Sequence, residues 1–267
     1  AARGQKIFSS ASTELATAIA SGTGMTGSGT ITVDSTTGFS SSGTLQINSE
    51  IFTYTGVTST TFTGVTRAQS STSAEAHSTN DVVSESWTER DASRSSAGKY
   101  NFERFNFDGN DKLVVVDGDN APTVFNTSIA ATDVSSGGGG EVTTAVTGAK
   151  FVTAFRDHMF YAGMSSTPQE LVFSVPFDED NFATGSGAGS IKVDDTIVGL
   201  KVFRSDLFIF CENRIFKLSG SSLSDFAIEP VTRNIGCVNG DTIQEFAGDL
   251  IFLGPDGLRT VAGTARI

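Results

Sequence analysis

Imidazole bases for acid–base chemistry are scarce in this chain. Its 267 residues include two histidines, His77 and His158. Glu50, Arg67 and His77 could form a polar constellation, but we expect Glu50 and Arg67 to flank strands and pair with each other, while His77 closes a loop. We expect His158 to occupy a turn. No GxSxG elbow appears, and no metal-ligand cluster has usable spacing. We therefore predict a non-enzymatic protein with no catalytic, cofactor-binding or metal-binding residues.

Two acidic turns suggest calcium, but their spacing argues against it. Asp108-Gly-Asn-Asp111 and Asp117-Gly-Asp-Asn120 are rich in carboxylate and amide oxygens. An EF-hand loop that starts at Asp117 would place Ala121 at position 5 and Pro122 at position 6, where a ligand and a glycine are required. Asp and Asn next to Gly are ordinary hairpin residues. We interpret both segments as turns, and metal binding there stays open.

The glycine run and the cysteines also favour structural roles. Ser135–Gly140 reads SSGGGG, and Glu-Val-Thr follows it instead of the Gly-Lys-Ser/Thr of a phosphate-binding loop, so we expect a flexible loop. Cys211 and Cys237 lie in apolar contexts without CxxC spacing, which predicts buried free thiols. Asp and Glu are too numerous for the sequence to exclude a glycosidase-type carboxylate pair.

The strands that must position these residues recur along the chain. Gly199–Gly220 reads as three short strands separated by polar turns. Its Phe203-x-x-Asp206-Leu207 is echoed by Phe155-x-x-His158-Met159 and Phe246-x-x-Asp249-Leu250, and more loosely by Phe107 before Leu113–Val116. Repeats of roughly 40–50 residues made of short strands are typical of propeller blades. The sequence predicts an all-β fold with four β-propeller-like units, the alternative being a meander sandwich.

Composition limits the classes of partner. The net charge is −12, and the chain holds 21 Phe against one Trp and three Tyr. An acidic surface disfavours a nucleic-acid reader that depends on phosphate contacts, although nucleic acid can still slide past it. The Phe side chain has no polar group, so it is typical of protein interiors and of subunit contacts that exclude water. No apolar run reaches membrane-spanning length.

The pattern divides the chain into four parts. We predict an N-terminal arm and Gly/Ser/Thr linker over residues 1–30, with a helix-compatible stretch at Ser12–Ala20. A small antiparallel β module of about five strands follows over 31–83, then a polar connector over 84–100 that contains Trp87. Blades occupy 101–267, and we expect this set of blades to be incomplete.

The small module resembles one that recurs in virion proteins of tailed bacteriophages. The resemblance rests on the run TLQINSEIFTYTGV, on FTGVTR and on the later histidine, matching at Leu45, Ile47, Glu50, Tyr54, Gly56, Phe62, Gly64, Val65, Arg67 and His77. That family usually has glycine directly after the arginine. This chain has Ala68 there, which puts the turn in doubt but leaves the strands intact.

The order of motifs over roughly residues 85–263 is similar to that of tail nozzle proteins of short-tailed phages, the group that includes tail tubular protein B. The motifs include FRDHMFYAG from Phe155, LFIF from Leu207 and IFKLSG from Ile215. The resemblance implies a virion tail protein that forms a homo-oligomeric ring, expected to be a hexamer, around the DNA exit channel. Its implied partners are an adaptor or tail-tube ring and fibres, with DNA passing through without specific binding.

Two other functions remain open from sequence. The first is a carbohydrate-binding propeller or receptor-binding adhesin, although the supply of Trp and Tyr for aromatic platforms is small. The second is a neck or baseplate protein of a tailed phage. The sequence does not distinguish nozzle, neck and baseplate, and it does not specify the host or the ring symmetry.

Overall fold

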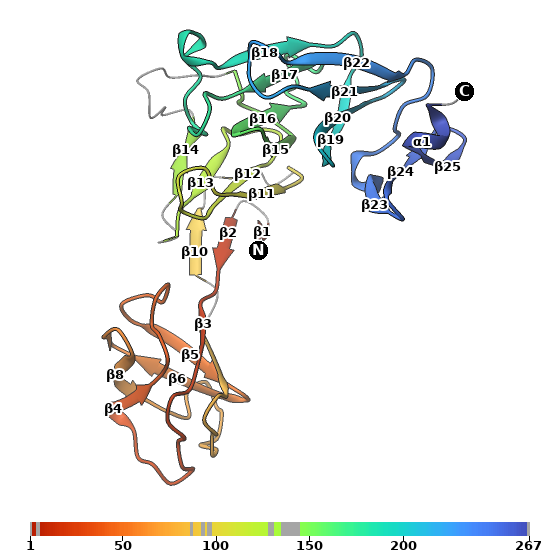
Figure 1. Ribbon diagram of the computed structural model, residues 1–267. Coiled ribbons are helices and arrows are strands. Elements are labelled where there is room, and N and C mark those ends of the chain that lie inside the picture. Colours follow the sequence, from red (N-terminus) through yellow and green to blue (C-terminus); the bar gives the residue numbers. More distant parts are fainter. Residues whose placement is uncertain are drawn as a thin grey trace. The chain divides into compact units, whose positions relative to one another are not determined.

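The computed structural model describes residues 2–3, 6–85, 88–91, 94, 98–127, 131–134 and 145–265. It separates into two compact units, Ala1–Ala92 and Ser93–Ile267. Both are built from antiparallel strands (Figure 1). In the described part of the chain, the α-helical content is one short helix, α1 (Val261–Thr264), accompanied by 3-10 turns. The prediction of an all-β fold is confirmed.

The first unit contains a seven-stranded sheet and a smaller sheet. The small sheet pairs β1 (Ala2–Arg3), β2 (Lys6–Ser9) and β10 (Thr88–Asp91). The strands of the larger sheet run in the order β3 (Ser12–Glu14), β9 (Val82–Glu85), β5 (Gly43–Ile47), β6 (Glu50–Tyr54), β8 (Thr61–Thr66) and β4 (Thr26–Thr32), and β7 (Gly56–Val57) also pairs with β8. Alternate residues of its central strands are buried, among them Leu45, Ile47, Phe52, Tyr54 and Phe62.

The predicted helix and linker at the N-terminus are wrong. Ser12–Glu14 is a strand paired with β9, and Leu15 and Ile19 are buried. The backbone N–H of Ile19 donates to the carbonyl of His77 at 2.9 Å. Pairing with the rest of the module satisfies these backbone groups, so tertiary contacts override the local helix preference. The supposed flexible linker likewise enters β4 at Thr26, where register shifts against β8 accommodate the small residues.

The predicted connector over 84–100 is wrong in part. Residues 84 and 85 close β9, and Thr88–Asp91 form β10. Trp87 lies outside the described residues, as does the glycine run at 135–140.

The second unit is a series of antiparallel sheets, each a simple up-and-down meander (Figure 1). Sheet 1 has β11 (Asn101–Phe105), β12 (Lys112–Val116), β13 (Thr123–Phe125) and β14 (Ala131–Asp133). Sheet 2 has β15 (Phe151–Phe155), β16 (His158–Ala162), β17 (Glu170–Phe173) and β18 (Gly189–Lys192). Sheet 3 has β19 (Ile197–Phe203), β20 (Asp206–Cys211), β21 (Ile215–Ser219) and β22 (Ala227–Thr232). Sheet 4 has β23 (Gln244–Phe246), β24 (Asp249–Gly254) and β25 (Gly257–Thr260).

The repeated sequence motif marks the first hairpin of each sheet. Phe155 pairs with His158, Phe203 with Asp206, and Phe246 with Asp249, each across a two-residue turn. In sheet 1 the equivalent pair is Phe105 with Lys112. The alignment on Phe107 is therefore shifted by two residues, because a longer loop carries Phe107 beyond the end of the strand.

Apolar side chains hold successive sheets together. Phe155, Phe160 and Phe173 of sheet 2 pack with Leu207 and Ile209 of sheet 3. Phe203, Phe208, Phe210 and Ile215 on the other face of sheet 3 pack with Leu250, Phe252 and Val261 in the region of sheet 4. The first strands of sheets 1 to 3 lie next to one another, since β15 contacts both β11 and β19. Four-stranded meanders stacked with their first strands adjacent are β-propeller-like blades.

Arginines join neighbouring hairpins. Arg156, in the first hairpin of sheet 2, donates from Nη2 to the carbonyl of Ser205 in the first hairpin of sheet 3, at 3.0 Å. Arg204 of sheet 3 donates in the same way to the carbonyl of Gly248 in sheet 4, at 2.8 Å. Each guanidinium also lies over the Phe that precedes it. In sheet 4 the corresponding position is Ala247, whose side chain cannot donate.

Candidate functional site

The structure brings together Glu50, Arg67 and His77, the polar residues singled out from the sequence. Arg67 donates from Nε to Glu50 Oε1 at 2.8 Å and from Nη2 to Oε2 at 2.7 Å. The backbone N–H groups of Ala68 and Glu75 also donate to this carboxylate, at 3.0 and 2.9 Å. All three side chains are buried. Glu50 begins β6 and Arg67 directly follows β8, so the two meet at one end of the sheet.

His77 completes this network from a loop. The Nδ2 of Asn48 lies 3.3 Å from His77 Nδ1, and His77 Nε2 lies 2.9 Å from Glu50 Oε2. Because an amide N–H donates to Nδ1, the proton sits on Nε2 and is donated to Glu50. Burial raises the pKa of Glu50, but the hydrogen bonds from Arg67, Glu75, His77 and Ala68 lower it by a larger amount. The net result is a pKa of about 2. The predicted pairing of Glu50 with Arg67 is confirmed.

The two acidic turns have the geometry of ordinary turns. Asp108 Oδ1 accepts the backbone N–H of Asn110 at 3.1 Å. Asp117 Oδ1 accepts the N–H groups of Asp119 and Asn120, at 3.0 and 2.8 Å. The described residues include no cluster of His, Cys, Asp or Glu arranged to hold a metal ion.

His158 and the two cysteines are buried. His158 begins β16, and its Nδ1 donates to the carbonyl of Ser174 at 2.6 Å within a group of phenylalanine rings. The expectation that His158 occupies a turn is therefore wrong, because His158 is the first residue of a strand. Its ring joins β16 to the segment after β17. Cys211 and Cys237 are free and buried, as predicted, and burial raises the pKa of both thiols.

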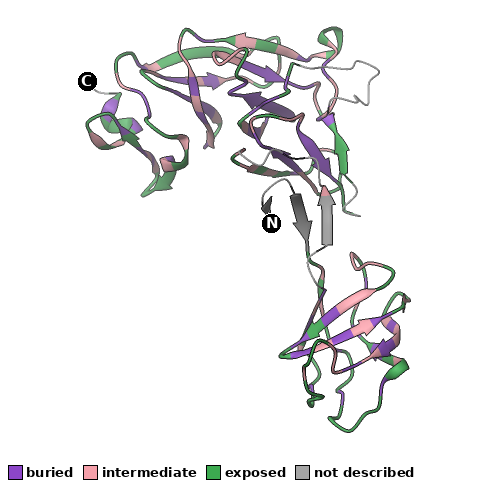
Figure 2. Ribbon diagram, turned by 180° about the vertical axis from the view of Figure 1, so that it is seen from behind, coloured by how far each residue is buried: buried purple, intermediate pink, exposed green. Residues whose placement is uncertain are grey.

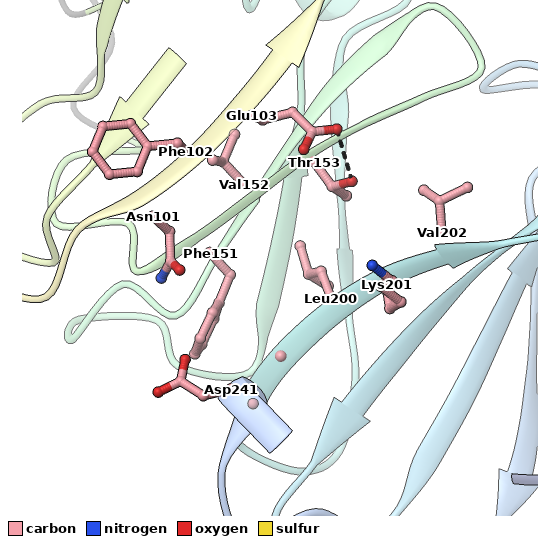
Figure 3. A pocket seen from close by; sticks show the side chains of 12 residues that line it. Asn101, Phe102, Glu103, Phe151, Val152, Thr153, Leu200, Lys201, Val202 and Asp241 are labelled. Atoms are coloured by element: carbon pink, nitrogen blue, oxygen red, sulfur yellow. Dashed lines mark hydrogen bonds between the residues drawn. The ribbon is translucent and has the colours of Figure 1, made fainter. Parts of the chain in front are cut away.

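The innermost strands of the second unit line a groove (Figure 3). A pocket of about 370 Å³ is bounded by β11, β15 and β19 and by the 3-10 turn Gly240–Thr242. The residues two positions before the hairpin Phe of the first three sheets, Glu103, Thr153 and Lys201, all line it. The sequence analysis did not predict this groove. The signal was that these three residues occupy the same position in successive repeats, which places them on equivalent strands.

Glu103 joins two sheets across the groove. Its Oε1 accepts the backbone N–H of Ala154 at 3.0 Å and the hydroxyl of Thr153 at 3.3 Å (Figure 3). Burial raises the pKa of Glu103, and this effect exceeds the opposing effects of these two bonds and of Lys201. Asp241, the other carboxylate of the pocket, is ion-paired with Lys99. The carboxyl groups of the groove thus already have structural partners.

The outer face of sheet 4 exposes several large apolar side chains, beside the polar residues Gln244, Asp249 and Thr260. Phe246 is 66% exposed, Leu258 73% and Leu253 38%, and the exposed segments of this sheet are visible in Figure 2. Strand register places Leu253 opposite Leu258 and Phe246 opposite Asp249, so these side chains and Ile251 share one face. We call Phe246, Ile251, Leu253 and Leu258 the outer apolar face. The unbroken run Leu250–Leu253 was its sequence signal, because such runs are typical of strands buried on both sides.

The outer apolar face repeats a face that is buried elsewhere in the stack. Phe246, Ile251 and Leu253 occupy the positions of Phe203, Phe208 and Phe210, counted from each hairpin. In sheet 3 these three phenylalanines pack under sheet 4. Sheet 4 therefore carries the side-chain pattern of a sheet that is covered by a neighbour.

Comparisons with known proteins give distant likenesses of fold only. No family model matches the chain, and no curated protein matches it. A BBS1 N-terminal domain crystallised in complex with ARL6 is 9% identical with a TM-score of 0.35, covering 60% of this chain and 46% of that one. The extracellular domain of a hybrid two-component system from B. thetaiotaomicron is 10% identical with a TM-score of 0.45, covering 96% of this chain and 33% of that one. The chain thus spans half or less of these structures. Within the described residues, no helix has the length and hydrophobicity to cross a membrane.

Proposed function

We propose that the protein is a non-enzymatic structural component of a bacteriophage tail that assembles as a homo-oligomeric ring around the DNA exit channel. Its place would be the nozzle or tail tube, and its localisation the virion. The sequence resemblance to tail nozzle proteins supports this proposal. So does the net charge of −12, because a conduit for DNA must not hold phosphates.

The observation that carries the proposal is the outer apolar face. Groups of exposed large apolar side chains are typical of interaction sites, and this group has the pattern that stacks sheets 3 and 4. We assign a second copy of the chain as its occupant. The contact would extend the stacking that already joins successive sheets of the second unit. It is therefore head-to-tail, and head-to-tail contacts close into rings when the rotation per subunit permits.

The test is the native mass of the chain, measured over a series of protein concentrations. We expect a discrete ring, with a hexamer as the specific expectation. Leu258→Lys should dissociate it, because burial of a leucine side chain contributes roughly 1.5–3 kcal/mol, or about ten- to hundredfold per contact.

Leu223→Lys is the matched control. Leu223 is also exposed, at 47%, but it lies in the turn between β21 and β22, away from the outer apolar face. This variant should keep the native mass of the wild type. A wild-type chain that stays monomeric at every concentration would overturn the proposal, and so would a ring that Leu258→Lys leaves intact.

A further inference from the structure

We propose that the region between sheets 2 and 3 holds a binding site for a small organic oxyanion of about monosaccharide size. The anionic group would be a carboxylate or a phosphate, contacted by Lys192, Arg214 and Arg233. This site is separate from the outer apolar face and does not depend on ring assembly.

The site is a pocket of about 540 Å³ at the outer strands of the two sheets. Lys192 ends β18 of sheet 2, Arg214 directly precedes β21 of sheet 3, and Arg233 directly follows β22. The remaining lining residues are Val193, Asp194, Phe216, Ile228, Pro230 and Asn234. This volume lies within the range of small-molecule sites, about 300–1,000 Å³.

The charge of the pocket contrasts with that of the chain. Three basic residues line it against one acidic residue, Asp194, although the whole chain carries 30 acidic and 18 basic residues. Asp194 is ion-paired with Arg214. Among the described residues, no ion pair joins Lys192 or Arg233 to a carboxylate, so two exposed cations remain available to a ligand.

The neighbouring carboxylates are directed elsewhere. Asp195 accepts the backbone N–H of Asn213 at 2.7 Å and its side-chain amide at 3.2 Å. Glu170 lies opposite Lys192 in the strand register, but within the described structure the two side chains form no ion pair. Positive charge therefore dominates locally.

A local irregularity of sheet 3 shapes the pocket. Ile215 pairs with Thr232 and Phe216 with Pro230, so Val231 is an extra residue in the edge strand β22. Such bulges redirect the side chains beside them. Buried Val193 and Phe216 provide an apolar floor, and exposed Ile228 and Pro230 an apolar wall.

This combination of groups specifies the class of ligand. Guanidinium groups match carboxylate and phosphate oxygens in geometry as well as charge. Asn234 offers an amide that can donate to or accept from a hydroxyl group. A ligand with an apolar face, such as a sugar ring, could rest on Pro230 and Ile228 while its anion meets the cations.

The experiment is a titration of the intact chain by calorimetry or protein-observed NMR. The probes are glucuronate, which carries a carboxylate, and glucose 6-phosphate, which carries a phosphate. Glucose is the neutral control. We expect saturable binding of at least one anionic sugar and none of glucose. The stronger of the two anionic probes identifies the anionic group.

Variants locate the binding. Lys192→Gln and Arg233→Gln alter exposed side chains and should fold normally, and each should weaken binding about tenfold, the size of one charge-assisted hydrogen bond. Lys217→Gln is the control. Lys217 lies on β21 with its ion-pair partners Asp206 and Glu229, outside the pocket, and its loss should leave affinity unchanged. No saturable binding, or equal weakening in all three variants, would overturn the proposal.

Discussion

Replacing Glu50 by glutamine gives the sharpest test of how the first unit is stabilised. The substitution preserves the shape of the side chain but removes its charge. The carboxylate accepts five contacts, two from Arg67, two from backbone N–H groups and one from His77. A glutamine has one oxygen to accept these donors, and its NH₂ group would face others. The buried guanidinium would lose its counter-charge.

The expected cost follows from these contacts. Breaking a buried ion pair by removing one partner costs about 3–5 kcal/mol, and each donor left without an acceptor costs about 1–3 kcal/mol. Arg67 keeps the carbonyls of Ala20, Thr23 and Glu75 as acceptors, so we expect about 4 kcal/mol in total. The first unit, Ala1–Ala92, has roughly 5–14 kcal/mol of stability at typical values per residue. Glu50→Gln should therefore remove much of it.

The assay is hydrogen exchange of the whole chain, followed by mass spectrometry. Peptides covering β5, β6 and β8 should lose protection in Glu50→Gln. Peptides from β20 and β21, in the second unit, provide an internal reference. The control variant is Glu75→Gln in the same module, because the Glu75 side chain is exposed and, in the described part of the chain, its carboxylate accepts from Ser49 alone. Its effect should stay within about 0.5 kcal/mol.

A loss below about 1 kcal/mol, the size of a single neutral hydrogen bond, would refute this reasoning. So would equal effects of the two glutamine substitutions. Either result would mean that the network of Glu50, Arg67 and His77 contributes no more to the stability of the unit than an exposed ion pair does.

Two further predictions concern the same end of the sheet. The pKa of Glu50 is lowered from 4.5 to about 2 on folding, so its stabilisation is complete above about pH 4.5 and is lost as the pH falls toward 2. At 1.36 kcal/mol per pKa unit this amounts to about 3 kcal/mol, measurable by urea unfolding across this pH range and absent in Glu50→Gln. Ala68 has φ of +54°, which costs a residue other than glycine roughly 1–2 kcal/mol. Ala68→Gly should therefore stabilise the unit by about 0.5 kcal/mol in urea unfolding, after the entropy of glycine is subtracted. Ala16→Gly, where φ is not positive, should destabilise it. Equal effects of the two glycine substitutions would contradict the strain argument.

The sequence predicted the parts of the fold that depend on local patterns. The Phe-x-x-Asp hairpins of sheets 3 and 4 were identified because two-residue turns and alternating apolar strands are visible within a few residues. The strands near Leu45 and Phe52 were identified for the same reason. In contrast, Ser12–Glu14 was predicted to be helical, because its pairing with β9 depends on residues about 70 positions away.

The candidate sites were harder to predict, because they depend on long-range packing. Glu50, Arg67 and His77 were recognised as a polar set, and the pairing of Glu50 with Arg67 was predicted correctly. The pocket with Lys192 and Arg233 gave no sequence signal, since its cations come from different sheets and converge only after stacking.

The hydrogen bonds between neighbouring hairpins have a mechanical consequence. Backbone ladders close within each sheet of the second unit, whereas Arg156 and Arg204 reach from one sheet to the next. A pulling force would then peel sheets away one at a time, as in other repeat arrays. At about 3.4 Å per extended residue, a unit of 48 residues, counted from Phe155 to Phe203, would lengthen the chain by about 160 Å. Sheet 4 is joined to sheet 3 by the Arg204 bond, so its detachment requires that bond to break first.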